Sequence, residues 1–526
     1  METQKGIIQP RGYRKFTLFL ILGATLVRSF LAATTDLGND EVYYILYAMF
    51  PDLSHFDHPP MVGFTIQLFS LDLFFRSEFF IRLGAIIFSA LSTWVIYLTG
   101  ETIKNARTGF FAALLFTASV YASLIAGTFI LPDAPQMLFW LLALLSFYRA
   151  FATEETNKYR APMVLAGIFT GLAMLSKYTA IFLWVGAALY VLLYQRQWLK
   201  KPVFYLSVLI SMGLFSPVLV WNQQNDFISF SFQGSRALFS EFRPSFFLTE
   251  LLGEFLYTNP IVYIMVAITL LQLVKGRKIC EQKAVRFLLM MSLPMIGFIG
   301  LISFSRQTLP HWTGPAFFAL LLLTACRLDS QWQNSGAHRA HLPAGIKSAL
   351  ILFLVGMSVS WIQVTTGIIP LEKMSIPDPT LDLYGWDQRG TAFREVRARA
   401  ISAGNIKANA PIMERRWFPA AHYDYYLAHD AGIHVLGVNS PGQIHKYAWI
   451  NHQRGGFPLH MDAWAIESTR DPQHPVKHYG KYFTQFTCYD TAYINRRGEV
   501  VDTLYFYIFR NLQIVPQLGQ TVDKKR

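Results

Sequence analysis

The chain has 526 residues, a formal net charge of +13 and three cysteines. Hydrophobic residues make up 53% of it and charged residues only 15%, against roughly 25% charged residues in an average soluble domain. This composition excludes a soluble protein. Cys280, Cys326 and Cys488 lie far apart in the sequence, which excludes a disulfide framework and a zinc ribbon. No nucleic-acid-binding motif is present, so we interpret the basic excess as a membrane orientation signal.

Eleven apolar runs predict membrane-spanning helices, because a bilayer core of about 30 Å needs about 20 apolar residues in a helix. The runs are 16–33, 79–99, 109–129, 134–151, 161–176, 178–194, 203–221, 257–274, 285–304, 313–328 and 346–369. The stretch 245–274 is interrupted by Glu250 and Glu254, so we expect its first half at the membrane interface. The first run is too long to be a cleaved signal peptide, and it lacks a small-residue cleavage site.

The loops between these runs differ in charge in a way that predicts the orientation. One alternate set of loops carries 20 Lys and Arg residues, while the other carries only Arg76, Lys177, Arg236, Arg243 and Arg306. Cytoplasmic loops are the ones rich in Lys and Arg, so the N-terminus is predicted to be cytoplasmic. With an odd number of spans, everything after about residue 370 is predicted to lie in a periplasm or its equivalent.

The composition changes after Pro370: Gly, Pro, Asp, Trp and His become frequent, and eight of the 13 histidines lie there. Apolar runs shrink to the length of strands. We therefore predict two domains, a transmembrane domain at 1–369 and a small soluble α/β domain at 370–526. Within the second, 433–438 and 503–509 are predicted strands and 390–403 is a predicted helix. Its aromatic motifs favour packing, with sugar stacking as the functional alternative.

Polar residues gather on the predicted periplasmic loops, and charges kept at one membrane face are candidates for function. The candidates are Asp40, Glu41, Tyr43, Asp57, His58, Asp133, Lys177, Tyr178, Arg306 and His311. Carboxylates beside cations suit a transfer from an anionic lipid headgroup. A hydroxyl acceptor needs a carboxylate as general base, and Asp40 or Asp57 could supply it. A phosphate leaving group needs a cation, which Lys177 or Arg306 could supply.

Each candidate also has a structural explanation, and the residues alone leave both open. Asp40 and Glu41 could cap a helix, as could Asp133. Asp57 and His58, before two prolines, could form a rigid turn. Lys177 could extend its amine to the membrane interface, and His311, next to a Trp, could belong to an aromatic belt.

Taken together and in this order, the motifs resemble the bacterial polyprenyl-phosphate-dependent glycosyltransferases related to the protein O-mannosyltransferases, with the aminoarabinose transferases of lipid A as relatives. The matching segments are Asn-Asp-Glu-Val-Tyr-Tyr at 39–44, Phe-Asp-His-Pro-Pro at 56–60, Leu-Pro-Asp-Ala-Pro at 131–135, Leu-Ser-Lys-Tyr-Thr-Ala at 175–180, Trp-Asn at 221–222 with Phe230 and Gln233, and Arg306 with Pro-His-Trp at 310–312. The resemblance covers about residues 20 to 330.

The resemblance implies a GT-C fold, meaning an α-helical polytopic membrane protein with about 11 transmembrane helices and an extracytoplasmic C-terminal domain. It implies an inverting glycosyltransferase of the bacterial inner membrane. The donor would be a sugar on a polyprenyl monophosphate, usually undecaprenyl phosphate, and the acceptor lipid A, a lipid-linked glycan or a protein. No GxGxxG motif for a sugar nucleotide is present.

The resemblance also implies roles for the candidates. Asp40 would be the base, with Glu41 supporting it. Lys177 and Arg306 would lie near the lipid phosphate, and Asp133 would orient the first loop or the sugar. Tyr43, Tyr178 and His311 would contact substrate.

Asp57 and His58 match a position where relatives have an acid that helps hold a metal, followed by a lysine that touches phosphate. His58 departs from this pattern. Either His58 replaces that cation when it is protonated, or it joins Asp57 as a ligand of a divalent metal.

Two functions from other classes remain as alternatives. A transporter or flippase of lipid-linked sugars would also have many spans and a periplasmic charge cluster, but it predicts charges at the midplane and a repeat between halves. The charges here lie at loop edges, and no repeat is seen. A non-catalytic scaffold would tolerate loss of Asp40. The sequence leaves the sugar, the acceptor and the oligomeric state open.

Overall fold

The computed structural model describes residues 10–153, 157–237, 241–334, 342–371, 374 and 376–517. Contacts within the chain divide it into two compact units. Within the described residues, the first unit contains the chain up to Ala33 and Asp52–Met357, and the second contains Thr34–Pro51 and the chain from Ser358 onward. The sequence-based division at 369/370 placed 34–51 in the first domain, whereas its contacts here are with the C-terminal part of the chain.

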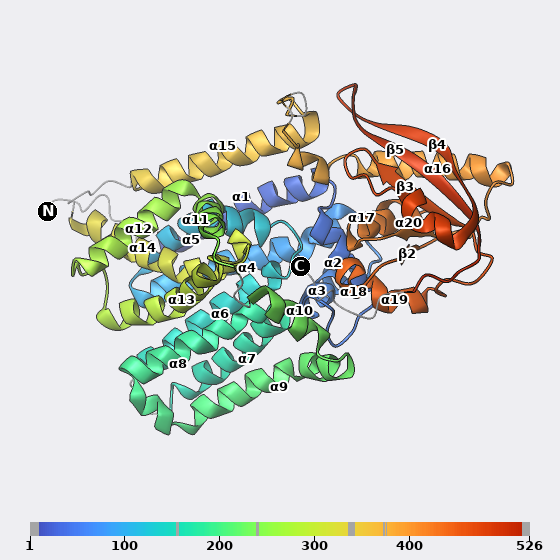
Figure 1. Cartoon of the computed structure of the whole chain (residues 1–526). Coiled ribbons are helices and arrows are strands. Elements are labelled where there is room, and N and C mark those ends of the chain that lie inside the picture. Colours follow the sequence, from blue (N-terminus) through green and yellow to red (C-terminus); the bar gives the residue numbers. More distant parts are fainter. Residues whose placement is uncertain are drawn as a thin grey trace. The chain divides into compact units, whose positions relative to one another are not determined.

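The first unit is a bundle of helices (Figure 1). In chain order its elements are α1 (Pro10–Thr34, whose last residue is in the second unit), α3 (Met61–Ser70), α4 (Glu78–Ile103), α5 (Ala106–Ala118), η1 (Tyr121–Ile125), α6 (Asp133–Ala152), α7 (Arg160–Ser176), η2 (Tyr178–Ile181), α8 (Phe182–Tyr194), η3 (Arg196–Lys200), α9 (Pro202–Gln224), α10 (Ile228–Ala237), α11 (Pro244–Thr258), α12 (Pro260–Val274), α13 (Gln282–Ile302), η4 (Pro310–Thr313), α14 (Gly314–Asn334) and α15 (Ala344–Thr366, which continues into the second unit).

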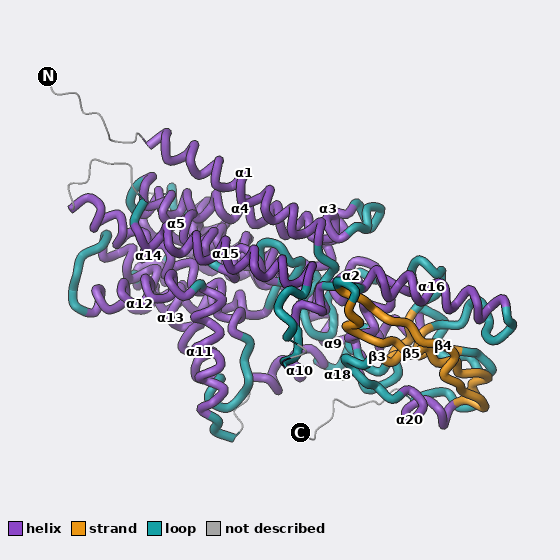
Figure 2. The backbone as a smooth tube through the Cα atoms, turned by 90° about the horizontal axis from the view of Figure 1, so that it is seen from above, coloured by secondary structure: helices purple, strands orange, loops and turns teal. Residues whose placement is uncertain are grey.

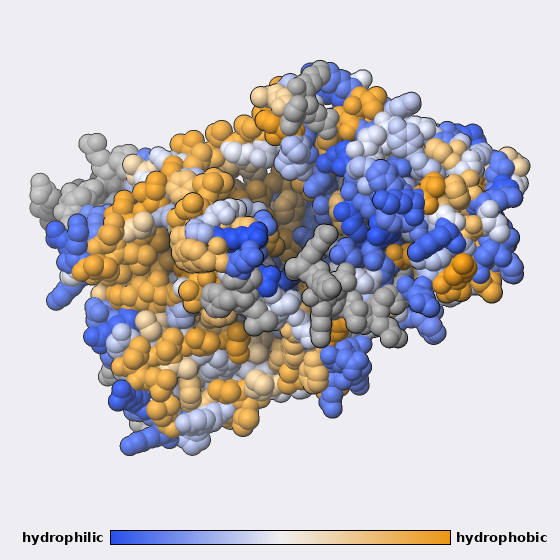
Figure 3. All heavy atoms as spheres, viewed as in Figure 1, coloured by the Kyte–Doolittle hydropathy of each residue, from blue (hydrophilic) through white to orange (hydrophobic). Residues whose placement is uncertain are grey.

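Among the described residues, six of these helices are long and apolar enough to cross a membrane: α1, α4, α6, α9, α13 and α15. A seventh span results if α11 and α12, which meet at a bend of 106°, count as one. Every predicted run overlaps a helix, but several of these helices are short, so the count of eleven stays a prediction. Large apolar side chains such as Ile351, Leu354 and Val355 on α15 are exposed, as expected of helices that face lipid. Figure 3 shows this apolar surface over the helices.

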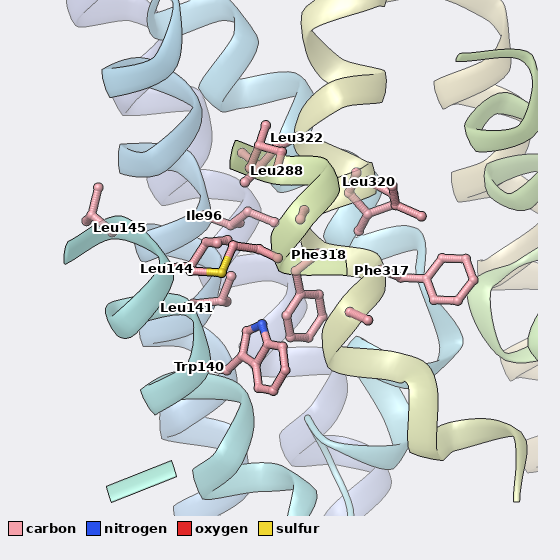
Figure 4. Packing of buried hydrophobic residues seen from close by; sticks show 14 of the residues in the cluster. Ile96, Trp140, Leu141, Leu144, Leu145, Leu288, Phe317, Phe318, Leu320 and Leu322 are labelled. Atoms are coloured by element: carbon pink, nitrogen blue, oxygen red, sulfur yellow. The ribbon is translucent and has the colours of Figure 1, made fainter. Parts of the chain in front are cut away.

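Small residues let two of the helices approach closely. A Cβ added to Gly167 of α7 would lie 2.4 Å from the backbone oxygen of Ser207 on α9. One turn further along, the Ser211 hydroxyl donates a hydrogen bond of 2.6 Å to the Gly167 carbonyl. Helices in lipid associate through such close contacts and hydrogen bonds, because lipid tails provide no hydrophobic drive for pairing. Larger aliphatic and aromatic side chains fill the centre of the bundle, among them Ile96, Trp140, Leu144 and Phe318 (Figure 4).

The predicted run 109–129 is a broken helix rather than a continuous span. α5 ends at Ala118, Ser119 is extended, and the chain then forms the π-helical turn η1. A break inside a membrane frees backbone carbonyls, and polar side chains must satisfy them. The Asn259 amide donates to the Ala118 carbonyl at 3.0 Å, and the Ser123 hydroxyl donates to the Thr117 carbonyl at 2.6 Å. The buried Arg28 of α1 donates to the Ser123 carbonyl at 3.3 Å.

The second unit is a mixed α/β domain, as predicted. Its elements are α2 (Asn39–Met49), η6 (Pro379–Leu383), α16 (Trp386–Ser402), β1 (Ile412–Glu414), α17 (Trp417–His422), η7 (Tyr423–Ala428), β2 (Val435–Gly437), α18 (Pro441–Ile444), α19 (Tyr447–Gln453), β3 (Ala463–Ser468), α20 (Pro475–Tyr479), η8 (Gly480–Tyr482), β4 (Phe483–Arg496) and β5 (Glu499–Leu512). The strands of its sheet lie together in Figure 2.

The sheet has five strands in the order β2-β1-β3-β5-β4. β1 pairs in parallel with both β2 and β3, so Ile412 lies between Val435 and Trp464. β3 and β5, and β5 and β4, are antiparallel. Because β1 and β3 run the same way, their carboxyl ends open on the same edge of the sheet. The predicted strands at 433–438 and 503–509 and the predicted helix at 390–403 correspond to β2, β5 and α16.

Glu414, the last residue of β1, is a buried carboxyl with a perturbed pKa. Its side chain is 2% exposed, and burial raises the pKa of this carboxyl to about 7, although the Arg415 N–H donates to it. Because the folded-state pKa lies above the unfolded value, folding binds a proton between about pH 4.5 and 7. The domain therefore loses stability as the pH rises through this window, by about 3 kcal/mol in total.

We expect Glu414→Gln to remove this loss. The variant should melt at a higher temperature than the wild type at pH 8, and at nearly the same temperature at pH 4.5, when both are measured by differential scanning fluorimetry in detergent. The matched control is Glu395→Gln, at an exposed position of α16. A difference between Glu414→Gln and wild type that is the same at both pH values would contradict the buried, protonated carboxyl.

Candidate functional site

A buried ion pair lies at the centre of the candidate site in the first unit. The Lys177 amine lies 2.7 Å and 2.9 Å from the two carboxylate oxygens of Asp133. Asp133 begins α6, while Lys177 is an extended residue between α7 and η2. The two side chains are buried and come from positions 44 residues apart in the sequence. Sequence analysis selected both residues, and the structure brings them together.

A third group completes the coordination of Asp133. The Tyr121 hydroxyl, on the π-helical turn η1, donates to Asp133 Oδ1 at 2.9 Å. Asp133 also lies at the N-terminus of α6, where the helix dipole favours a negative charge. The carboxylate therefore stays ionised in an apolar setting because a cation, a hydroxyl and the helix end all stabilise it. The break in the predicted span at 109–129 is what places Tyr121 there.

Two histidines that the sequence analysis selected adjoin this pair. Burial lowers the pKa of His58 to about 4, against the attraction of the Asp57 carboxylate. Burial also lowers the pKa of His311, in η4, to about 4, and the Lys177 ammonium contributes. Both imidazoles are therefore neutral at neutral pH. For His58, a neutral ring disfavours the alternative of a protonated cation that takes the place of lysine.

The loop that carries Asp57 and His58 is held by α9 and α10. Three contacts fix it: the Trp221 indole N–H donates to Asp52 at 2.9 Å, the Ser229 hydroxyl donates to the His55 carbonyl at 2.9 Å, and the Gln233 amide donates to the Asp57 carbonyl at 2.5 Å. The ring of Phe56 packs on Phe232 with centroids 4.5 Å apart. This explains why Trp221 and Gln233 occur in the same motif set as Asp57: they set the path of its loop.

Tyr178 and Arg306 flank these groups. Tyr178 follows Lys177 directly, and its hydroxyl lies among Ser54, Asn222 and Ser229. Arg306 is partly buried and lies in the loop that joins α13 to η4, the element that carries His311. Each of these residues is therefore on an element that leads to the ion pair. Their contact with substrate stays a prediction.

Asp40, Glu41 and Tyr43 lie in the second unit, on α2. Asp40 is exposed in the first turn of the helix, whereas Glu41 is 2% exposed and accepts a hydrogen bond of 2.8 Å from the Gly38 N–H. Glu41 thus caps α2, which was its structural alternative. Tyr43 is buried, and its hydroxyl accepts from the Lys446 N–H at 3.3 Å. The catalytic role of Asp40, and a role of Glu41 and Tyr43 beyond packing, stay predictions.

The structure adds two residues that the sequence analysis did not select. Tyr121 gave no signal, because it lay inside a predicted apolar span. Arg236 did give one, as a basic residue on a loop poor in positive charge. Its charge acts on the His58 imidazole, and its guanidinium lies 4.1 Å from the centre of the Phe232 ring. Arg236 therefore lies beside the loop of Asp57.

Comparison with known proteins finds a family model that matches part of the chain. Residues 57–221 match the family model described as dolichyl-phosphate-mannose-protein mannosyltransferase. This segment contains Asp57, His58, Asp133, Lys177 and Tyr178, which is most of the candidate site of the first unit.

Two curated relatives extend the similarity. The lipid A galacturonosyltransferase RgtD of Rhizobium johnstonii is 23% identical over 392 residues, which are 74% of this chain and 78% of the relative. The undecaprenyl phosphate-alpha-4-amino-4-deoxy-L-arabinose arabinosyl transferase of Pseudomonas savastanoi is 25% identical over 353 residues, which are 64% of this chain and 63% of the relative.

Among solved structures, ArnT from Cupriavidus metallidurans is similar over nearly the whole chain. The TM-score is 0.60 at 15% sequence identity, and the match covers 93% of this chain and 97% of ArnT. A second structure of that protein contains undecaprenyl phosphate. The likeness shows that the fold is the GT-C fold that the motifs implied, with membrane helices and a C-terminal domain built around a small sheet.

The buried ion pair generates a stability prediction. Lys177→Met should destabilise the protein strongly, because it leaves the Asp133 charge buried without its cation, and breaking a buried pair typically costs about 3–5 kcal/mol. The double variant Lys177→Met/Asp133→Asn should recover part of this loss. Thermal melting in detergent measures both, and Lys200→Met, an exposed lysine of η3, is the control. A double variant destabilised by the sum of the effects of the two single variants, Lys177→Met and Asp133→Asn, would show that the two charges are not coupled.

Proposed function

We propose that this chain, which belongs to the GT-C glycosyltransferases related to the protein mannosyltransferases, takes its sugar from a polyprenyl monophosphate, undecaprenyl phosphate in a bacterium. The acceptor would be a hydroxyl of lipid A, a lipid-linked glycan or a protein. The observation that carries the proposal is the buried Lys177–Asp133 pair, with His58 and His311 beside it. Lys177, Asp133 and His58 lie in the region that matches the mannosyltransferase family model. The named relatives act on such lipid-linked donors or on lipid A.

The reaction is a displacement at the anomeric carbon. The acceptor hydroxyl attacks that carbon, its proton passes to the Asp40 carboxylate, and the bond between the anomeric carbon and the phosphate oxygen breaks with its electrons on the phosphate. The sugar is transferred with inversion. A general base of this kind contributes roughly 10²–10⁴-fold to the rate.

Lys177 can serve the leaving phosphate while it remains paired with Asp133. An ammonium group has three N–H donors, and Asp133 takes two of them. The third N–H can bond a phosphate oxygen. Arg306, on the loop after α13, and Arg236, on α10, add positive charge. In this arrangement Asp133 and Tyr121 hold the lysine in place, so little reorganisation is needed as charge develops on the phosphate.

We also propose an orientation. The distribution of Lys and Arg among the loops supports a cytoplasmic N-terminus in the bacterial inner membrane. The second unit, with Asp40 on α2, would then lie in the periplasm. Acceptors of this kind are found in that compartment, on the envelope surface.

We propose that a divalent metal ion binds at Asp57 and His58. A carboxylate and an imidazole are adjacent there, and two protein ligands suffice where phosphate oxygens complete the shell, as is usual for Mg²⁺ and Mn²⁺. Such an ion would supply positive charge to the phosphate, and Asp57 and His58 would hold it through one carboxylate oxygen and one ring nitrogen.

The transfer itself can be tested in cells that lack the chain. Lipids, glycans and envelope proteins are compared by mass spectrometry after complementation with wild type, Asp40→Asn or Asp72→Asn. A sugar-sized mass should be restored by wild type and by Asp72→Asn, which changes an exposed turn, and reduced at least about 100-fold by Asp40→Asn. Full restoration by Asp40→Asn would exclude Asp40 as the base and favour transport or scaffolding.

The metal proposal makes a separate prediction for the purified enzyme. A chelator should lower the rate of transfer by at least about tenfold, and Mg²⁺ or Mn²⁺ should restore it. Asp57→Asn should need a higher metal concentration for half-maximal activity, because one ligand loses its charge. A wild-type rate that is insensitive to the chelator would remove the metal from the proposal and leave the role of Lys177 untouched.

A further inference from the structure

The second unit contains a polar hollow that the transfer reaction does not use. Its volume is about 250 Å³, and it lies where the carboxyl ends of β1 and β3 meet. Arg416 follows β1 by two residues, and Arg470 follows β3 by two. In sheets with parallel strands, ligands bind beyond these carboxyl ends, where the loops diverge. A neighbouring hollow of about 470 Å³ shares Arg470 and Asp502 with it.

The floor of the hollow is rigid and fully hydrogen-bonded. Asp502 is 2% exposed and accepts from Arg389 at 2.9 Å, from the Ser468 hydroxyl at 2.8 Å and from the Thr469 hydroxyl at 2.9 Å. Arg389 is as deeply buried, and its guanidinium lies 4.5 Å from the centre of the Trp386 ring. These contacts preorganise the floor, so a ligand would not have to order it.

The side chains around the hollow include polar groups that can form further hydrogen bonds. Among the described residues, the Arg470 guanidinium makes long hydrogen bonds of 3.3 Å, to the Asp378 carbonyl and to Asp382, and its side chain is a quarter exposed. Arg416 pairs with Asp471, while its Nε is buried and has no hydrogen-bond partner among the residues the structure describes. The Arg416 side chain is 37% exposed, so a ligand can reach its guanidinium group.

Aromatic side chains complete the lining. Tyr423 is 3% exposed and contributes its ring to the hollow, next to Phe418. The indole of Trp386 is fixed from behind by the His422 imidazole, stacked at 3.7 Å between ring centroids. A few convergent polar groups around aromatic surface are typical of a small-molecule site.

The charge of the lining narrows the ligand class. Three arginines and three aspartates face or frame the hollow, so their formal charges cancel. A strongly anionic ligand would find no excess of positive charge. Guanidinium and carboxylate groups side by side instead offer donors and acceptors for neighbouring hydroxyl groups, and the aromatic rings offer a surface for the apolar face of a sugar ring.

We propose that this hollow is a saccharide-binding site of the C-terminal domain. It takes one uncharged sugar ring, with hydroxyl groups of the sugar on Arg416, Arg470 and the Tyr423 hydroxyl, and the ring against Phe418. The adjoining hollow extends the site for a second ring. This goes beyond the transfer reaction, because it gives the domain a binding function of its own that does not require Asp40 or Lys177.

Binding to the full-length chain in detergent tests the proposal. Saturation-transfer NMR and isothermal titration use four probes: methyl galactoside, N-acetylglucosamine, its β-1,4-linked disaccharide and galacturonate. At least one neutral probe should bind with a Kd of about 1 mM. Arg470→Met and Tyr423→Phe should each weaken that binding by about tenfold or more, through loss of a hydrogen bond to the ligand. Asp40→Asn should bind as wild type does.

The matched control is Arg399→Met, which removes an exposed arginine of the same domain that pairs with Asp490. It should leave binding unchanged, and all variants should melt at the wild-type temperature. Three outcomes would overturn the site: no binding of any neutral probe to wild type, binding of galacturonate alone, or unchanged binding by both Arg470→Met and Tyr423→Phe. Each can occur while the transfer reaction remains intact, so failure here does not depend on the proposed function.

Discussion

The buried pair of Lys177 and Asp133 is the constraint on which the candidate site depends. A charge in an apolar bundle is tolerated only when it is paired and hydrogen-bonded. Here the Lys177 ammonium and the Asp133 carboxylate neutralise each other. The pair therefore fixes the start of α6 against the junction of α7 and η2. The Tyr121 hydroxyl meets the same requirement by donating a hydrogen bond to Asp133, and the charges of the pair act on the imidazoles of His58 and His311. The site that we propose for an anionic lipid phosphate is therefore balanced in charge before the phosphate binds.

Breaks in the helices position the residues of the site, and polar side chains satisfy the backbone groups that these breaks leave unbonded. α5 stops at Ala118 so that η1 can present Tyr121, and α11 turns into α12 at Asn259. The Asn259 amide donates to the carbonyl of Ala118, at the end of α5, and to the carbonyl of Ala349 in α15, and thereby ties both interruptions to a third helix. Irregular backbone at membrane depth occurs only where protein satisfies it, so these polar residues are needed for the fold as well as for the site.

The second unit combines a short segment from the start of the chain with the C-terminal domain. Leu37 donates its N–H to the Tyr426 hydroxyl, Asn39 contacts His422, and Tyr43 packs against Trp417. Asp40 is thus presented by a helix whose support comes from residues more than 300 positions later. This arrangement joins Asp40, whose carboxylate is the proposed general base, to the domain that carries the saccharide hollow. Acceptor binding and catalysis can therefore share one rigid body.

The sequence by itself determined the membrane helices, the α/β character of the C-terminal domain and most of the candidate residues. Apolar periodicity and loop charge are local properties. A motif such as Ser176-Lys177-Tyr178 can likewise be recognised in the sequence without knowing which residues contact it in the fold. Only the tertiary structure decided that Asp133 meets Lys177, that Tyr121 joins them, that Glu41 caps its own helix and that 34–51 packs with the C-terminal domain. These depend on contacts between distant segments and on where a helix breaks, and the polar groups that stabilise a break lie far away in the chain.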